Sequence, residues 1–187
     1  TASTTALCAL PSFDAAARLL RDLRRGLPSL SAFELMWADY VDAGCEVSRL
    51  KPPFDASHPV YVLVEALGME EAAERATMEA RLGEALEAGV VDDVIIAQSL
   101  DDAKGLWAYR ESIGELLGRL KPFAAFDVGI PVPAMDGFVT QVRNALTQRF
   151  PAQKHLFFGH IGDGNLHVLS GPHADASSLH DVESVVY

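Results

Sequence analysis

One stretch of sequence decides how this chain folds, and it reads Phe157-Phe158-Gly159-His160-Ile161-Gly162-Asp163-Gly164-Asn165-Leu166-His167-Val168-Leu169. An Asp-Gly pair between two apolar runs is the strongest short-range signal for a tight β-hairpin, because both central residues of a type I′ turn need positive φ. We therefore predict a turn at Asp163 and Gly164, with His160 directly opposite His167. Directly opposed side chains share one face of the hairpin with Cβ atoms about 5 Å apart. The two imidazoles could then bind one divalent metal ion.

A pair of opposed histidines also has a second interpretation, as a stacked, hydrogen-bonded surface pair that binds nothing. Gly159 and the small or turn-forming residues 162–165 favour a ligand-binding role, because glycine lets a ligand or another backbone approach closely. Two imidazoles are an incomplete metal site. A working site needs at least a third ligand, typically a carboxylate, and an open position for substrate. The residues alone leave both interpretations open.

The composition is that of one globular domain. The chain has 187 residues, 49% of them hydrophobic and 22% charged, with a formal net charge of −11. This acidity argues against nucleic acid as a partner. No apolar run approaches the roughly 20 residues that cross a bilayer, so we expect no transmembrane segment. Cys8 and Cys45 have no CxxC spacing and are expected to be reduced thiols, which predicts a cytoplasmic protein.

The remaining elements alternate between strands and helices. We expect strands at 5–10, 31–36, 59–66, 90–98 and 123–130, and helices at 13–25, 70–88, 99–120 and from 133 through 146. The strand at 5–10 is expected at a sheet edge. The predicted fold class is α+β, a ferredoxin-like antiparallel sheet with helices packed on one face and a closing β-hairpin.

Arg110 lies on the apolar stripe of the predicted helix at 99–120. A buried guanidinium without an anion is prohibitively costly, so Arg110 must meet a carboxylate of the protein or an anionic ligand. One interpretation is an internal ion pair with Glu34, Glu65 or Asp127, all on predicted strands. The other is a bidentate clamp on a substrate carboxylate, a geometry that suits arginine.

The hairpin motif from Gly159 to His167 resembles the hallmark of the C-terminal substrate domain of FAD-linked oxidases of the vanillyl-alcohol-oxidase type. It is most similar to the D-2-hydroxyacid dehydrogenases, which include D-lactate dehydrogenase, the glycolate oxidase D subunit and D-2-hydroxyglutarate dehydrogenase. Weaker matches follow in the expected order at 30–36, 62–65, 97–99, 106–111 and 126–131.

The resemblance implies that His160 and His167 ligate a divalent metal, zinc or manganese, which binds the 2-hydroxyl and carboxylate groups of a 2-hydroxyacid. It implies that Arg110 binds the substrate carboxylate and that Asn165 lies near substrate and flavin. The implied cofactor is FAD, which takes a hydride from C2 and passes electrons to an acceptor.

Residues 1–187 would then be a truncated substrate and metal domain. The resemblance places the FAD-binding domain before this stretch. It places a Ser-x-Glu-His-Gly motif, with a third metal ligand and a catalytic histidine, after Tyr187. We therefore expect no catalytic residue within residues 1–187 and no turnover by this piece alone. Self-association into a homodimer, through surfaces that the FAD-binding domain would cover, is a further expectation.

Two positions depart from the family pattern. Relatives that hold a second carboxylate have a hydroxyl residue and a lysine where this chain has Gly114 and Ala125. The departure argues against specificity for a 2-hydroxydicarboxylate. The alternative function is a non-enzymatic ferredoxin-like module that binds a small ligand or assembles through its sheet, with His160 and His167 as structural residues.

Overall fold

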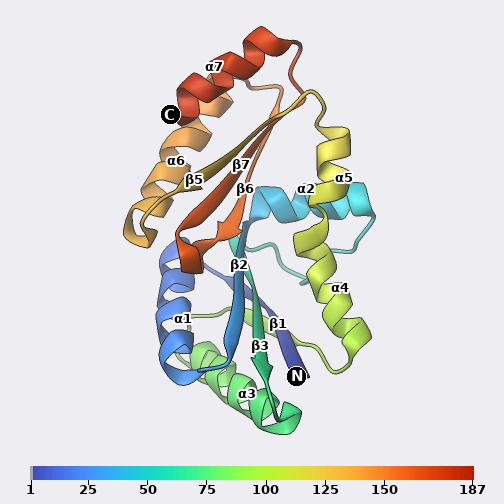
Figure 1. The fold of residues 1–187 in the computed structure, drawn as a ribbon, viewed down its shortest axis with the longest axis vertical. Helices are drawn as coiled ribbons and strands as arrows, with labels where there is room; N and C mark the ends of the chain where they lie inside the picture. Colours follow the sequence, from blue (N-terminus) through green and yellow to red (C-terminus); the bar gives the residue numbers. More distant parts are fainter. Residues whose placement is uncertain (1) are drawn as a thin grey trace.

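The computed structural model describes residues 2–187, without the side chains of residues 176 and 177. Its centre is a seven-stranded antiparallel sheet in the order β4-β1-β3-β2-β6-β7-β5 (Figure 1). The strands are β1 Ala2–Leu10, β2 Leu30–Trp37, β3 Val60–Gly68, β4 Asp93–Ile96, β5 Ala124–Gly129, β6 Lys154–His160 and β7 Asn165–Gly171. The predicted α+β class with an antiparallel sheet is confirmed. The strand expected at an edge, β1, instead lies between β3 and β4.

Helices cover both faces of the sheet, whereas the sequence analysis expected them on one. The helices are α1 Phe13–Gly26, α2 Ala38–Ser48, α3 Glu71–Glu87, α4 Leu100–Glu111, α5 Ile113–Arg119, α6 Val132–Arg149 and α7 Ala176–Val186. Figure 1 shows α1, α3, α6 and α7 on one side and α2, α4 and α5 on the other. The reason lies in strands such as β1, in which Ala6 and Cys8 enter one core while Leu7 and Ala9 enter the other. Apolar residues on both faces require two helical layers.

The order β4-β1-β3-β2 with its crossing helices is a ferredoxin-like unit, and β6, β7 and β5 extend it. Within the described residues, two ladder pairs join the two parts of the sheet, Leu35 with Gly159 and Met36 with Phe158. A side-chain ion pair supports this short junction, because Arg143 of α6 donates to Asp39 of α2 at 2.7 Å. At the other end of the same junction Glu34 of β2 contacts His160 of β6.

The hairpin has a longer turn than predicted. Residues Ile161–Asp163 form a single 3-10 turn, and only Gly164 in this turn has a positive φ, +69°. His160 therefore pairs with Asn165, and His167 pairs with Phe158. Burial of Ile161 in the core favours this turn over a two-residue type I′ turn. The side chain of Arg24 stabilises it further by donating to the carbonyl of Gly162 at 2.6 Å.

The helix expected at 99–120 is two helices, α4 and α5, which divide at Ser112. Two side-chain hydroxyl groups donate hydrogen bonds to main-chain carbonyls at this break. Ser112 Oγ donates to the carbonyl of Tyr109 at 2.9 Å, and Tyr40 Oη donates to that of Arg110 at 2.6 Å. Gly44 of α2 contacts this break so closely that a Cβ there would lie 2.4 Å from Ser112 Oγ. The break therefore positions Arg110 against the sheet.

Candidate functional site

The histidines of the hairpin lie side by side on one face of the sheet. The ring centroids of His160 and His167 are 5.2 Å apart, and the rings are nearly perpendicular at 85°. They are diagonal neighbours rather than a directly opposed pair, because His167 pairs with Phe158, two residues before His160. Phe158 also packs against the His167 ring, with centroids 4.8 Å apart. The longer turn thus changes the register and keeps the two imidazoles together.

Each imidazole is held by a carboxylate through the same nitrogen. His160 Nδ1 lies 2.6 Å from Glu34 Oε1, and His167 Nδ1 is hydrogen-bonded to Asp127. A carboxylate only accepts, so Nδ1 carries a proton in both rings, and Nε2 is the nitrogen that can offer a lone pair to a ligand. Neither Nε2 has a hydrogen-bond partner among the residues that the structure describes. Burial lowers the pKa of His167, and its hydrogen bond to Asp127 opposes part of that shift.

Arg110 shares the same buried carboxylate. Its Nε donates to Glu34 Oε2 at 2.9 Å, and its guanidinium lies 4.6 Å from the centre of the Phe158 ring. The two side chains of this ion pair are only 11% and 8% exposed. Of the two interpretations of Arg110, the internal ion pair is present, with Glu34 as its partner. The Tyr40 hydroxyl also interacts with the Arg110 side chain, and Arg110 lines a cleft.

The other two candidate partners of Arg110 have different roles. Glu65 accepts from Trp107 Nε1 at 3.0 Å and from Thr5 Oγ1 at 3.3 Å. Asp127 binds His167. The sequence analysis named Glu34 and Asp127 only as partners of Arg110 and missed that they hold the histidines. The available signal was a lone acid within each apolar strand segment, Phe33–Met36 and Phe126–Val128.

Asn165 adds an unsatisfied acceptor next to His160. It is the ladder partner of His160, so both side chains lie on the same face of the hairpin. Its Oδ1 is buried and has no hydrogen-bond partner among the described residues. A buried acceptor without a donor is costly, so this atom fits a donor group of a bound ligand.

Two clefts meet this cluster. One, of about 350 Å³, contains Arg110, Asp127, Phe158 and His167 together with apolar side chains of α5, β5 and β7. The other, of about 360 Å³, is lined by His160, Glu34 and the region around Arg24. Within residues 2–187, the described side chains include no group of three His, Cys, Asp or Glu that could hold a metal ion.

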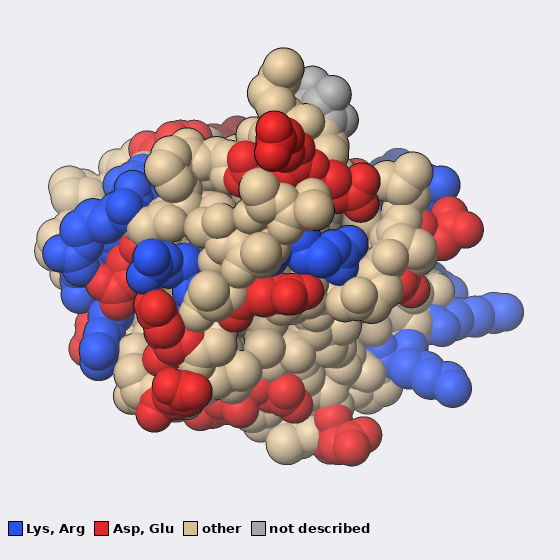
Figure 2. Space-filling view, turned by 90° about the horizontal axis from the view of Figure 1, so that it is seen from below, with Lys and Arg blue, Asp and Glu red and all other residues tan. Residues whose placement is uncertain are grey.

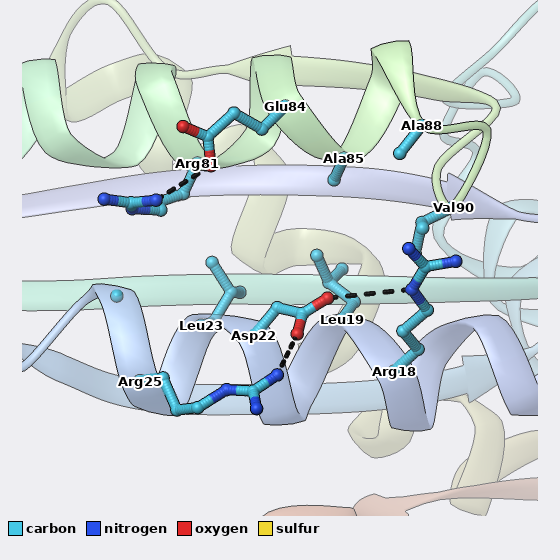
Figure 3. A pocket seen from close by; sticks show the side chains of 11 residues that line it. Arg18, Leu19, Asp22, Leu23, Arg25, Arg81, Glu84, Ala85, Ala88 and Val90 are labelled. Carbon is cyan, nitrogen blue, oxygen red and sulfur yellow. Dashed lines mark hydrogen bonds and ion pairs between the residues drawn. The ribbon is translucent and has the colours of Figure 1, made fainter.

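A further cleft, of about 420 Å³, lies between α1 and α3, on the opposite face of the sheet (Figure 3). Its charged side chains are already paired on the surface. Asp22 pairs with Arg18 at 3.8 Å and with Arg25 at 2.5 Å, and Arg81 pairs with Glu84 at 2.8 Å. Figure 2 shows Lys and Arg interspersed with Asp and Glu at one end of the molecule. Among the described residues, the α1–α3 cleft is lined by no histidine and by no buried side-chain polar atom that lacks a hydrogen-bond partner.

None of the helices in the described residues is long and apolar enough to cross a membrane.

The sequence profile described as "FAD linked oxidases, C-terminal domain" matches residues 1–185. The chain is 37% identical over 169 residues to D-2-hydroxyglutarate dehydrogenase of Xanthomonas citri pv. viticola, an alignment that covers 89% of this chain and 34% of that protein. It is 32% identical over 173 residues to the mitochondrial D-2-hydroxyglutarate dehydrogenase of Arabidopsis thaliana, which covers 91% of this chain and 30% of that protein.

The chain therefore spans about a third of the length of the curated relatives that it matches. The solved structure of an alkyldihydroxyacetonephosphate synthase superposes on 100% of this chain and 39% of that chain, with a TM-score of 0.66 and 9% sequence identity. This likeness shows a shared fold. The profile match and the sequence identities together show the family: the chain belongs to the C-terminal domains of the FAD-linked oxidases.

Proposed function

We propose that this chain is the substrate-binding part of an FAD-dependent oxidoreductase that converts a D-2-hydroxyacid to the 2-oxoacid. The observation that carries the proposal is Glu34, a buried carboxylate that holds His160 and Arg110 at once. It brings an imidazole and a guanidinium to one point beside His167. The names of the relatives support this reaction class, and membership of the family supports FAD as the cofactor.

His160 and His167 would hold a divalent metal, zinc or manganese, through their Nε2 atoms. Histidine ligands of metals commonly donate their other ring N–H to a carboxylate, which fixes the tautomer and makes the ligand more basic. Glu34 and Asp127 make these contacts here. The remaining positions on the metal would be taken by substrate oxygens and by a ligand from outside the described residues. Bound there, the ion would polarise the 2-hydroxyl and carboxylate oxygens.

Arg110 and Asn165 would orient the substrate. The Nη nitrogens of Arg110 would bind its carboxylate, while Glu34 keeps the guanidinium in place through Nε. The buried Oδ1 of Asn165 accepts a hydrogen bond from the ligand. In the reaction the C2–H and O–H bonds break and a C=O bond forms. FAD would supply the hydride acceptor, and the proton would go to a base outside the residues described here.

The test uses the full-length polypeptide that carries this chain, loaded with FAD. Turnover of a panel of D-2-hydroxyacids is measured with an artificial electron acceptor, and bound metal is measured by elemental analysis. We expect His160→Ala and His167→Ala each to lower metal content and to reduce kcat/KM by at least about 100-fold. His180→Ala is the control, because His180 is exposed and lies in α7.

Two results would count against the proposal. A full-length protein that binds no metal, with unchanged turnover in both histidine variants, would make the histidines a structural pair. A protein that binds 2-hydroxyacids without oxidising any of them would favour the non-enzymatic ligand-binding module.

A further inference from the structure

Arg24 lies in the last turn of α1 and joins that helix to the turn of the hairpin. The residue is exposed, and its Nη2 donates to the carbonyl of Gly162 at 2.6 Å, across 138 residues of chain. The donor carries a full charge, so this hydrogen bond is stronger than one between two neutral groups. Arg21, also exposed in α1, forms no side-chain hydrogen bond or ion pair among the described residues. One specific contact therefore distinguishes Arg24 from its neighbour.

The turn that Arg24 contacts lies between two residues of the candidate site. His160 directly precedes the 3-10 turn Ile161–Asp163, and Asn165 begins the strand after it. His160 and Asn165 are ladder partners, so a movement of the turn displaces both of them. A slip of one residue in an antiparallel pair would bring the side chains of one strand to the opposite face. The conformation of the turn thus decides where the His160 ring and the Asn165 amide lie.

The turn is held at three points. At its start Ile161 is completely buried, and at its end the carbonyl of Gly164 accepts from the N–H of Ile130 at 2.8 Å. The hydrogen bond inside the turn, from the N–H of Gly164 to the carbonyl of Ile161, is longer at 3.2 Å. Gly162 lies in the middle, and glycine has more conformational freedom to lose than any other residue. Arg24 supplies the contact that restrains this middle residue.

Arg24 acts on the site from outside. It lines the cleft of about 360 Å³ together with Glu34 and His160, but its side-chain hydrogen bond goes to the main chain of Gly162. Glu34 of β2 holds the ring of His160 at Nδ1. The ring of His160 and the backbone that follows it are consequently restrained by two different elements, β2 and α1.

We propose that Arg24 is a positioning residue, which holds the turn so that Nε2 of His160 and Oδ1 of Asn165 keep the arrangement that binds metal and substrate. The inference rests on the proposed function and adds a residue of α1 to it. Without this hydrogen bond, Gly162 is released and the turn populates other conformations. Only a fraction of the molecules then has the binding arrangement, and the apparent affinity falls by that fraction. The fold persists, because Ile161 remains buried.

The experiment uses the full-length polypeptide that carries this chain, loaded with FAD. Arg24→Ala removes the donor, and Arg24→Lys restores a charged donor at the same position. Arg21→Ala is the matched control, because it removes the same charge from the same helix without removing a contact. Hydrogen exchange is followed by mass spectrometry in peptides that cover residues 156–169, and calorimetric titration of the metal-free protein gives the Kd for zinc. Thermal unfolding checks that each variant is folded.

We expect faster exchange in the turn of Arg24→Ala and a Kd for zinc that is raised about tenfold. The kcat/KM for the 2-hydroxyacid that the unmodified protein oxidises fastest should fall by a similar factor. Arg24→Lys should recover part of each loss, whereas Arg21→Ala should match the unmodified protein. A residue that only stabilised the fold would lower the unfolding temperature and leave the Kd of the folded protein unchanged.

Each other outcome overturns a different statement. Unchanged exchange in the turn of Arg24→Ala would show that Arg24 does not hold it, and this would overturn the inference. Faster exchange with an unchanged Kd and unchanged kcat/KM would also overturn it, because the turn would not position the site. An unmodified protein that neither binds zinc nor oxidises any 2-hydroxyacid would instead overturn the proposed function, and with it the positioning role.

Discussion

The cleft at Arg110 and the cleft between α1 and α3 both combine arginines with carboxylates, yet they differ in how those charges are held. In the α1–α3 cleft the pairs join residues three or four apart on one helix, and Arg25 is 76% exposed (Figure 3). At Arg110 the pair joins residues 76 positions apart and is almost wholly buried. Exposed pairs contribute little because water and salt screen them. The buried carboxylate instead orients two other side chains, and this distinguishes a site from a charged surface.

Removal of the Glu34 carboxylate, which His160 and Arg110 share, is expected to have the largest effect on the free energy of unfolding. Glu34→Ala leaves Arg110 buried without its counter-charge, so the free energy of unfolding should fall by about 3–5 kcal/mol. Urea unfolding of the chain measures this change. Glu34→Gln keeps the shape and should recover part of the loss. A decrease below about 1 kcal/mol would mean that Arg110 finds another anion, for which Asp127 on the same cleft is a candidate.

The packing that places Arg110 gives the second prediction. Gly44→Ala puts a methyl group 2.4 Å from Ser112 Oγ, so α2 must move away from the break between α4 and α5. We expect a loss of about 1–3 kcal/mol in the free energy of unfolding. Gly105→Ala is the matched control in α4, where a Cβ meets nothing within 4 Å, and it should stabilise the chain by up to about 1 kcal/mol. Equal effects of the two changes would contradict this account.

A network of buried histidines is expected to make the free energy of unfolding depend on pH. His155 Nε2 donates to the carbonyl of Phe150 at 3.0 Å, which leaves Nδ1 to accept from Ser170 Oγ at 2.9 Å. His173 Nε2 lies 2.8 Å from the same Ser170 Oγ. Burial is the main cause that lowers the pKa of both histidines below 6.5. Both rings are therefore neutral in the folded chain and protonate more easily in the unfolded chain.

The free energy of unfolding should consequently be highest above a pH of about 6.5 and fall as the pH decreases below it. Urea unfolding between pH 7.5 and pH 5 measures the slope. His155→Gln should reduce that slope. His180→Ala, which removes an exposed histidine, should leave it unchanged. The same slope in both variants would show that His155 does not contribute.

The smallest effect is expected where the charges are exposed. Asp22→Ala removes the partner of both Arg18 and Arg25 in the α1–α3 cleft. We expect a change of less than about 1 kcal/mol in the free energy of unfolding, reduced further at high salt. A loss as large as that of Glu34→Ala would remove the distinction between the two clefts.

Much of this arrangement follows from local sequence patterns. Ser12 and Ser99 cap the helices that follow them, and each hydroxyl accepts from a main-chain N–H at 3.1 Å. The apolar stripe around Arg110 predicted a buried partner, which is present. The prediction of a two-residue turn was wrong because the Asp-Gly pattern takes only neighbouring residues into account. The turn that forms depends on the burial of Ile161 and on the hydrogen bond from Arg24 of α1. Metal and substrate roles of His160, His167, Arg110 and Asn165 stay predictions.

The sequence by itself determined the α+β class, the place of the hairpin, and the nearness of His160 to His167, because side-chain periodicity and turn chemistry act over a few residues. Only the tertiary structure decided that helices cover both faces and that Glu34 reaches His160 across 126 residues of chain. The pairing of β2 with β6 brings that carboxylate to the site. Which strands become neighbours depends on the burial of the whole sheet, and no local pattern contains that information.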